Sequence, residues 1–147
     1  MRNYYLQIHE YVEKLVLSTM VLDKKGIKYN GDTFSFLELF ILKLLGDQQE
    51  KKMYEIIEEL DIDRNTMNTA INRLYFSKYL TKKKSEDDKR VQILQLTERG
   101  KITFEQVISV EKEILFSLLN DFTFNEEKAI LKFLVKIDML SKKTDSK

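Results

Sequence analysis

The chain has 147 residues, with no cysteine, a single histidine, no proline and a formal net charge of +1 at pH 7. The lack of cysteine excludes disulfides and thiolate chemistry, and one histidine is too few for a metal cluster. No apolar run is long enough to span a membrane, and the N-terminus does not resemble a signal peptide. We therefore expect a cytoplasmic protein without a cofactor or metal, in which any nucleic-acid site depends on local placement of charge.

Two helices and a connection between them are predicted in the first third of the chain. Apolar residues recur at three- and four-residue steps from Tyr5 to about Val21, which indicates an amphipathic helix of about four turns. Residues 23–32 carry two glycines and two lysine clusters, so we expect a surface connection there. Ser35 and Glu38 then form a capping box, which predicts a largely buried helix over the apolar run that follows.

Two short amphipathic helices come next, in close succession. The first covers residues 53–60, and the second begins after Asp63 and ends near residues 76–78. Asp63 suits the N-cap of the second helix, because its carboxylate can accept hydrogen bonds from first-turn amides. Only residues 61–63 separate the two helices, which is too short for a generic bundle and is typical of a helix-turn-helix.

The second of these helices has one apolar face and one face of small, uncharged polar side chains. The apolar residues are Met67, Ala70, Ile71 and Leu74, and the polar residues are Asn65, Asn68, Thr69 and Asn72. Asn and Thr can both donate and accept hydrogen bonds, so such a face suits base edges better than plain solvent. We expect Asn68 and Asn72 to bind bases, as in bidentate contacts to adenine, with Arg64 beside them and Arg73 placed for a phosphate.

A basic β-hairpin is predicted after the helix pair. The β-branched content of residues 91–96 favours a strand, which would pair with a strand entered at residues 79–81. Residues 78–90 hold six positive and three negative side chains, a net charge of +3 against +1 for the whole chain. The residues expected to contact DNA here are Lys82, Lys83, Lys84, Asp88, Lys89 and Arg90. Lysines would neutralise backbone phosphates, and Arg90 could enter a narrow A·T minor groove.

Two further helices close the chain. Thr97 is expected to cap a long helix reaching about Leu119, and Thr123 with Glu126 forms a second capping box. The terminal helices are apolar over more surface than a winged domain of roughly 65 residues could cover, which predicts burial against a second copy. We therefore expect a mainly α fold with a small β-wing. Residues 31–97 would form a winged helix-turn-helix DNA-binding domain, and residues 1–30 and 98–147 a helical dimerisation region.

The segment from Ile62 to Lys101 resembles the MarR (multiple antibiotic resistance regulator) family, including its staphylococcal Sar-type branch. The matching residues are Asn72-Arg73-Leu74, the wing motif Asp88-Lys89-Arg90, and Leu96-Thr97-Glu98-Arg99-Gly100. The resemblance covers about residues 29–101 well and the outer helices by position only. The chain departs from the family in having no cysteine for a thiol switch, and in having Lys78 where a glycine commonly follows the recognition helix.

This resemblance implies a homodimer in which the terminal helices intertwine and two winged domains bind a palindrome. It also implies that Arg90 lies in the minor groove, steadied by Asp88. In some members a small-molecule effector binds between the dimer arm and the winged domain. The expected function is a dimeric, sequence-specific transcriptional regulator that binds a palindromic A·T-rich operator in double-stranded DNA, as a repressor of stress, resistance or virulence genes.

Two other classes of function compete with this interpretation. A winged domain can serve as a protein-docking module without sequence-specific DNA binding, and Tyr75 and Phe76 on the second helix are the residues that favour it. An enzyme is not expected, because the chain has no cysteine, a single histidine, no phosphate-binding glycine loop and no metal-ligand spacing.

Overall fold

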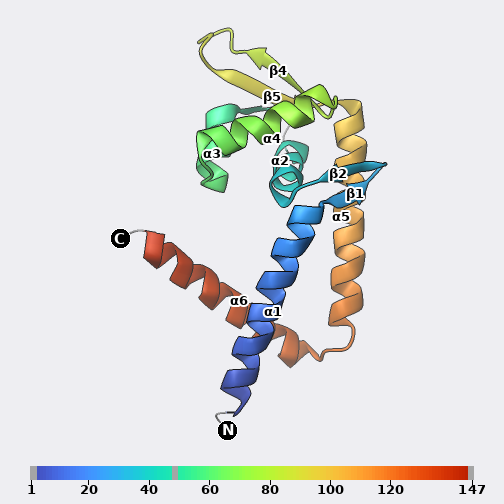
Figure 1. Ribbon diagram of the computed structural model, residues 1–147, viewed down its shortest axis with the longest axis vertical. Coiled ribbons are helices and arrows are strands. Elements are labelled where there is room, and N and C mark those ends of the chain that lie inside the picture. The colour runs from blue at the N-terminus through green and yellow to red at the C-terminus, as the bar shows by residue number, and fades with distance from the viewer. Residues whose placement is uncertain (1–2, 48–49, 146–147) are drawn as a thin grey trace. The chain divides into compact units, whose positions relative to one another are not determined.

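The computed structural model describes residues 3–47 and 50–145, and its secondary structure is mainly helical with small antiparallel sheets, as the sequence predicts (Figure 1). The chain divides into two compact units, Met1–Val107 and Ile108–Lys147. The boundary between them falls inside the fifth helix. Residues 1–2 and 146–147, the outermost part of the predicted dimerisation region, lie outside the described residues.

The first helix is followed by a hairpin. Helix α1 spans Asn3–Lys25, and strands β1 (Ile27–Tyr29) and β2 (Asp32–Phe34) pair in antiparallel fashion after it. Asn30 and Gly31 form the turn with φ angles of 54° and 82°. Positive φ at both central residues is the signature of the two-residue turn that Asn-Gly favours. Of the surface connection expected over residues 23–32, residues 23–25 belong to α1 and residues 27–32 to a β-hairpin, for which the Asn-Gly pair is the sequence signal.

Helix α2, Phe36–Gly46, lies at the centre of the core of the first unit. It begins with the predicted capping box: the Glu38 amide donates to Ser35 Oγ at 3.2 Å, and the Ser35 amide donates to Glu38 Oε1 at 2.7 Å. The buried apolar residues of the core are Phe34, Leu39, Ile41, Leu42, Leu45, Met53, Ile56, Met67, Ala70, Ile71, Leu74, Tyr79, Leu80, Leu94, Leu96 and Val107. They join α2 to the helix pair and to the wing.

The helix pair is confirmed with its predicted turn. Helix α3 spans Met53–Leu60 and helix α4 spans Arg64–Phe76. Asp63 caps α4, because its carboxylate accepts the Thr66 amide at 3.0 Å and the Thr66 hydroxyl at 2.7 Å. The hydrogen bond from the Thr66 side chain is the main reason that the pKa of Asp63 lies below its ordinary value. All four predicted apolar residues of α4 are buried, so its polar face is turned away from the core.

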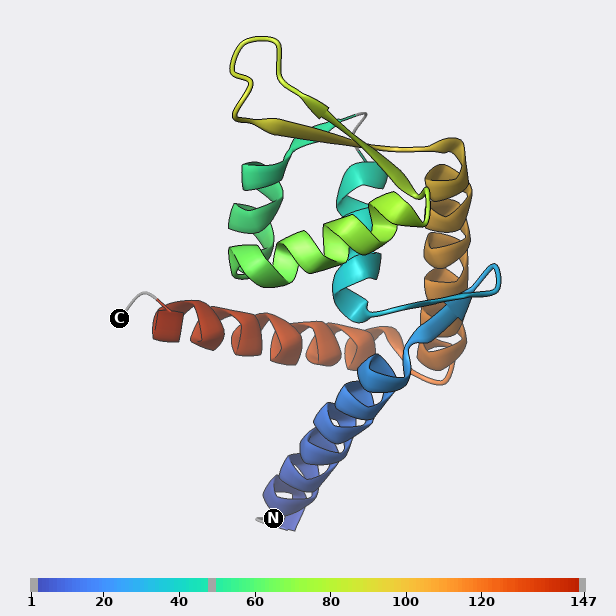
Figure 2. The same ribbon diagram turned by 45° about the horizontal axis from the view of Figure 1, so that its top comes forward.

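The wing is a hairpin within a three-stranded antiparallel sheet. Strands β3 (Lys51–Lys52), β4 (Leu80–Lys84) and β5 (Gln92–Leu96) are arranged in the order β3-β5-β4. The register pairs Leu80 with Leu96 and Lys84 with Gln92, which leaves residues 85–91 as the tip. Figures 1 and 2 show the hairpin projecting past α3 and α4, as the sequence predicts for a wing.

The last two helices begin at their predicted caps. Helix α5 spans Glu98–Leu119, and the Gly100 amide donates to Thr97 Oγ1 at 3.1 Å. Helix α6 spans Phe124–Asp145, and Thr123 and Glu126 form a reciprocal capping box with hydrogen bonds of 2.8 and 3.2 Å. None of the helices in the described ranges combines the length and the apolar character needed to cross a bilayer.

Lys78 ends α4 in the left-handed conformation, with a φ of 67°. The Lys78 amide donates to the Tyr75 carbonyl at 3.0 Å, and the Tyr79 amide donates to the Leu74 carbonyl at 2.9 Å. These are the two hydrogen bonds of a Schellman motif, in which the left-handed position is usually a glycine. The departure at Lys78 therefore leaves the helix exit in the geometry that a glycine would adopt, with the steric cost carried by the lysine.

Replacing Lys78 with glycine should raise the free energy of unfolding by about 0.5 to 1 kcal/mol, because relief of the left-handed strain exceeds the entropy that glycine adds to the unfolded chain. Urea unfolding at neutral pH measures this change. Lys89→Gly is the matched control, since Lys89 is not among the positive-φ residues. It should be neutral or destabilising, and equal effects of the two substitutions would contradict the strain argument.

Candidate nucleic-acid interface

The outward face of α4 carries the predicted amide and hydroxyl side chains. Asn65, Thr69 and Asn72 are exposed, and Asn68 is half-buried. Their spacing of i, i+3, i+4 and i+7 places them on one face of a helix, the pattern with which recognition helices contact bases. The Thr69 hydroxyl donates to the Asn65 carbonyl at 3.0 Å, so its remaining capacity toward a ligand is to accept.

A hollow of about 330 Å³ lies between the beginning of α4 and the wing. It is lined by Met53, Tyr54, Arg64, Asn68, Arg90, Val91 and Gln92. Three of the predicted site residues, Arg64, Asn68 and Arg90, therefore come together although they belong to two separate elements. Two guanidinium groups beside an amide suit a ligand that carries both negative charge and hydrogen-bonding edges, as a DNA strand does.

Asp88 holds Arg90 at the wing tip. Arg90 Nε donates to Asp88 Oδ1 at 3.1 Å, Arg90 Nη2 donates to Oδ2 at 3.2 Å, and the Arg90 amide donates to Oδ1 at 3.0 Å. The hydrogen bond from the Arg90 side chain, followed by that from its amide, lowers the pKa of Asp88 below its ordinary value. The Arg90 side chain is 91% exposed, so it is oriented by Asp88 and still open to a ligand.

The wing lysines fall into two groups. Lys82 Nζ donates to Asn72 Oδ1 at 2.6 Å, and Lys83 Nζ pairs with Glu50 Oε2 at 3.2 Å. Lys84 and Lys89 are exposed, and no ion pair to either is found within the part of the chain that the structure describes. The lysine cluster predicted from the sequence is thus only partly available for phosphates in this conformation.

Arg73, which the sequence predicts to contact a phosphate, is held by contacts within the first unit. Its Nη1 donates to Glu38 Oε2 at 2.8 Å, its Nη2 donates to the Thr33 carbonyl, and its guanidinium lies 5.2 Å from the centroid of the Phe34 ring. These contacts tie α4 to α2 and β2. Both terminal nitrogens thus have partners within the same unit, and the phosphate contact expected of Arg73 stays a prediction.

A polar cluster at the base of the wing was missed by sequence reasoning. The fully buried Tyr79 donates its hydroxyl to Asp32 Oδ2, and Arg99 Nη2 donates to Asp32 Oδ2 at 2.7 Å and to the Tyr79 hydroxyl oxygen at 3.0 Å. Burial, followed by the hydrogen bond to Asp32, raises the pKa of Tyr79, which keeps the phenol protonated as a donor. The cluster joins β2, the entrance of β4 and the start of α5.

The motif Leu96–Gly100 supplies the rest of this junction. The Thr97 hydroxyl donates to the Lys78 carbonyl at 2.6 Å, and the Thr97 amide donates to the Tyr79 carbonyl at 3.1 Å. A Cβ on Gly100 would lie 2.0 Å from the Tyr79 carbonyl oxygen, so a larger residue cannot fit without moving the backbone. The motif thus fixes where the wing meets α5. The sequence motif alone does not indicate this structural role.

This arrangement of helix pair, polar recognition helix and wing defines a winged helix-turn-helix DNA-binding regulator. The sequence profile of the transcriptional regulators SarA/Rot matches residues 24–107, more than half of the chain. The chain therefore belongs to the SarA/Rot family, whose winged helix is MarR-like, which confirms the family predicted from the sequence.

Individual relatives agree with this assignment. The chain is 29% identical to the transcriptional repressor MdtR of Bacillus subtilis, over 60% of this chain and 57% of MdtR. It is 24% identical to the transcriptional regulator SarZ of Staphylococcus epidermidis, over 85% of this chain and 75% of SarZ. Its fold is similar to that of Streptococcus pneumoniae FabT in a crystal structure with DNA, with a TM-score of 0.82 at 19% identity, over 95% of this chain and 98% of FabT.

The cluster around Tyr79 should make the free energy of unfolding fall at acid pH. The hydrogen bond from Tyr79, with further contributions from Arg99, holds the pKa of Asp32 below its ordinary value of 3.8. Asp32 therefore stabilises the fold fully above its unfolded-state pKa, and this contribution is lost as pH falls through the lower, folded-state pKa.

The variant Asp32→Asn should accordingly be destabilised at pH 7 and less so near pH 3, so that its free energy of unfolding changes less between these values than that of the natural chain. Urea unfolding at each pH measures this. Asp87→Asn, at the exposed wing tip, is the control for removing one carboxylate. Identical pH profiles for the two variants would show that the cluster is not the source of the acid sensitivity.

Proposed function

We propose that the chain is a dimeric repressor that binds a specific operator in double-stranded DNA through α4 and the wing. The observation that carries this proposal is the convergence of Arg64, Asn68 and Arg90 on one hollow between α4 and the wing. With α4 in the major groove, Arg90 would reach the adjacent minor groove, where narrow A·T tracts attract a guanidinium.

The other predicted site residues divide into those that would contact bases and those that would contact phosphates. Asn65, Asn68, Thr69 and Asn72 face bases from α4, while Lys83, Lys84 and Lys89 on the wing neutralise phosphates. Lys83 must then exchange Glu50 for a phosphate, which is favourable because an exposed ion pair contributes little. Arg73 is left out of the interface for the reason given above.

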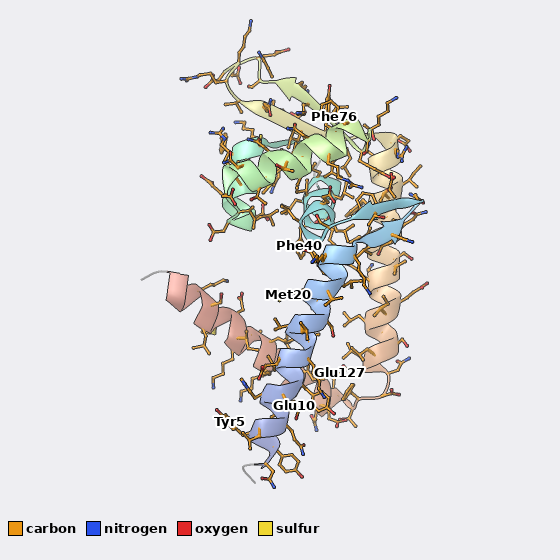
Figure 3. All side chains as sticks on the ribbon, in the orientation of Figure 1. Tyr5, Glu10, Met20, Phe40, Phe76 and Glu127 are labelled. Atoms are coloured by element: carbon orange, nitrogen blue, oxygen red, sulfur yellow. The ribbon has the colours of Figure 1, made fainter. Side chains whose placement is uncertain are left out.

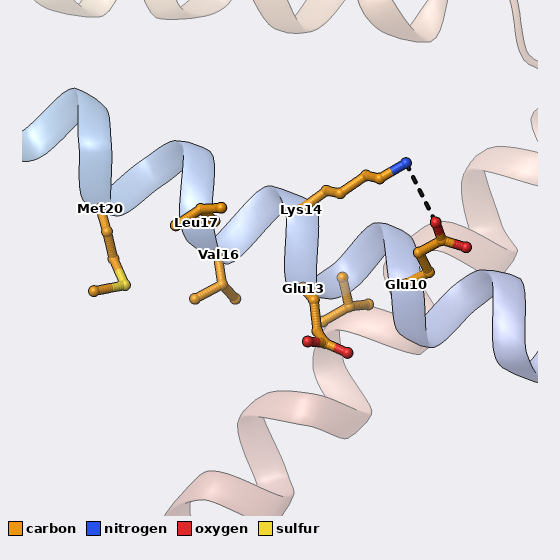
Figure 4. A pocket seen from close by; sticks show the side chains of 7 residues that line it. Glu10, Glu13, Lys14, Val16, Leu17 and Met20 are labelled. Atoms are coloured by element: carbon orange, nitrogen blue, oxygen red, sulfur yellow. Dashed lines mark ion pairs between the residues drawn. The ribbon is translucent and has the colours of Figure 1, made fainter.

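Apolar surface on α1 supports dimerisation. None of the described α1 residues is buried, and Tyr5 and Met20 are 73% and 64% exposed (Figure 3). Val12, Val16, Leu17 and Met20 form an open apolar stretch on this helix, with Glu10, Glu13 and Lys14 around them (Figure 4). A monomer rarely leaves this much contiguous apolar surface in water.

The second unit, taken by itself, also exposes many apolar side chains. Its exposed apolar residues include Ile114, Phe116, Phe124, Leu131, Leu134 and Met139. We propose that residues 1–30 and 98–147 of two copies cover one another and place the two recognition helices about 34 Å apart, one turn of DNA. The operator would then be palindromic. The small-molecule effector implied by the family resemblance stays a prediction.

A protein-docking module is the second candidate function. Phe76 lies at the end of α4 and is 76% exposed, and its ring centroid is 5.4 Å from that of Tyr75 (Figure 3). In this alternative the aromatic pair would bind a protein, and the chain would not retard any duplex. Gel shifts with A·T-rich promoter fragments at two salt concentrations separate the two functions.

Replacing Arg90 with alanine should weaken duplex binding and lower the slope of log K against log salt by about one, because one cation no longer displaces counterions. Fluorescence anisotropy across a salt series measures both quantities. Lys101→Ala removes an exposed positive charge from α5 and should leave the slope as it is. A slope that Arg90→Ala does not change would remove the wing from the binding surface.

A further inference from the structure

Lys82 is held against the recognition helix by two contacts. Side chains alternate between the faces of a strand, so Lys82 shares a face of β4 with the buried Leu80, whereas Lys83 lies on the other face. The Lys82 ammonium is 2.6 Å from Asn72 Oδ1 and 4.6 Å from the centroid of the Tyr75 ring. The side chain is half-buried, unlike its exposed neighbours Lys83 and Lys84.

This contact fixes the orientation of the Asn72 amide. An ammonium group can only donate hydrogen bonds, so the Asn72 atom beside it must be the oxygen and not the nitrogen. The amide nitrogen keeps both of its hydrogens available. The oxygen keeps one lone pair, but the ammonium beside it carries a positive charge that disfavours a second donor there. Asn72 and Lys82 together present donors to whatever lies against this end of α4.

Such a surface distinguishes between purines in the major groove. Adenine presents an acceptor, N7, beside a donor, the N6 amino group, so a bidentate contact requires an asparagine that both donates and accepts. Guanine presents two acceptors, N7 and O6. The donors of Asn72 and Lys82 can satisfy both acceptors of guanine. The amino group of adenine would instead have to donate to an oxygen that already accepts from a cation.

We infer that Lys82, by engaging the Asn72 amide oxygen and placing a positive charge beside it, makes this end of α4 select guanine in the operator. The inference rests on the proposed function and refines it, since it replaces the adenine contact expected of Asn72. Asn68 is not tied in this way, because no hydrogen bond to its side chain is found among the described residues, and it keeps both its donors and its acceptor for adenine.

Selection of bound duplexes from a random pool tests the inference. The variant Asn72→Ala identifies the base position that Asn72 contacts, because the preference there is lost. At that position the natural chain should prefer guanine over adenine by about tenfold, within the range of a bidentate contact. Lys82→Met keeps the aliphatic stem on Tyr75 and frees the amide oxygen, so the preference should shift toward adenine.

Lys83→Met is the matched control. It removes the same charge from the next residue of β4 and leaves Asn72 untouched, so guanine should remain preferred even where overall affinity falls. Adenine selected by the natural chain at the Asn72 position, or guanine retained by Lys82→Met, would overturn the inference and leave a sequence-specific regulator in place. A natural chain that enriches no duplex at all would instead overturn the proposed function.

A measurement on the free protein guards against variants that bind DNA poorly. The side-chain amide resonances of Asn72 should move in Lys82→Met and stay in place in Lys83→Met, while the rest of the spectrum shows that both variants are folded. Resonances that do not move in Lys82→Met would mean that the ammonium does not orient the amide, and the inference would fail without reference to DNA.

Discussion

The buried phenol of Tyr79 holds together the elements that position the wing. Its ring packs edge-on against Phe34, with centroids 5.0 Å apart, and its hydroxyl is shared by Asp32 and Arg99. Its carbonyl accepts the Thr97 amide at the entrance of α5. Each polar group of this buried residue therefore has a partner, so its burial carries no penalty for an unsatisfied hydrogen bond. One side chain thus links the first hairpin, the wing and α5.

The position of Tyr79 in the chain links it to the proposed binding surface. Helix α4 ends at Phe76, the left-handed Lys78 turns the chain, and β4 begins at Leu80, directly after the phenol. The direction in which the wing leaves α4 is consequently set within a few residues. Lys82 then meets Asn72, and Arg90 reaches the hollow beside Asn68. A recognition helix and a wing can enter adjacent grooves only if their relative placement is fixed in this way.

Local signals in the sequence predicted most of this architecture. Helix caps form contacts between residues at most four positions apart, as at Ser35, Asp63 and Thr123, and the apolar face of α4 follows a similarly short period. Such local features can be predicted from the sequence alone. The contact between Asp32 and Arg99 spans 67 residues and depends on how the elements pack, which no periodicity encodes. The contact between Arg73 and Glu38, which lies 35 residues away, could not be predicted for the same reason. The predicted domain limits and the DNA-contacting roles stay predictions.

The DNA affinity of Arg99→Met, measured by anisotropy over a range of salt concentrations, tests most directly whether the Tyr79 cluster positions the binding surface. Arg99 belongs to that cluster and not to the proposed contact surface. We expect weaker binding with the salt slope of the natural chain, because the cations proposed to meet phosphates are all still present but are less well placed. Affinity equal to that of the natural chain would show that the wing is positioned without the cluster.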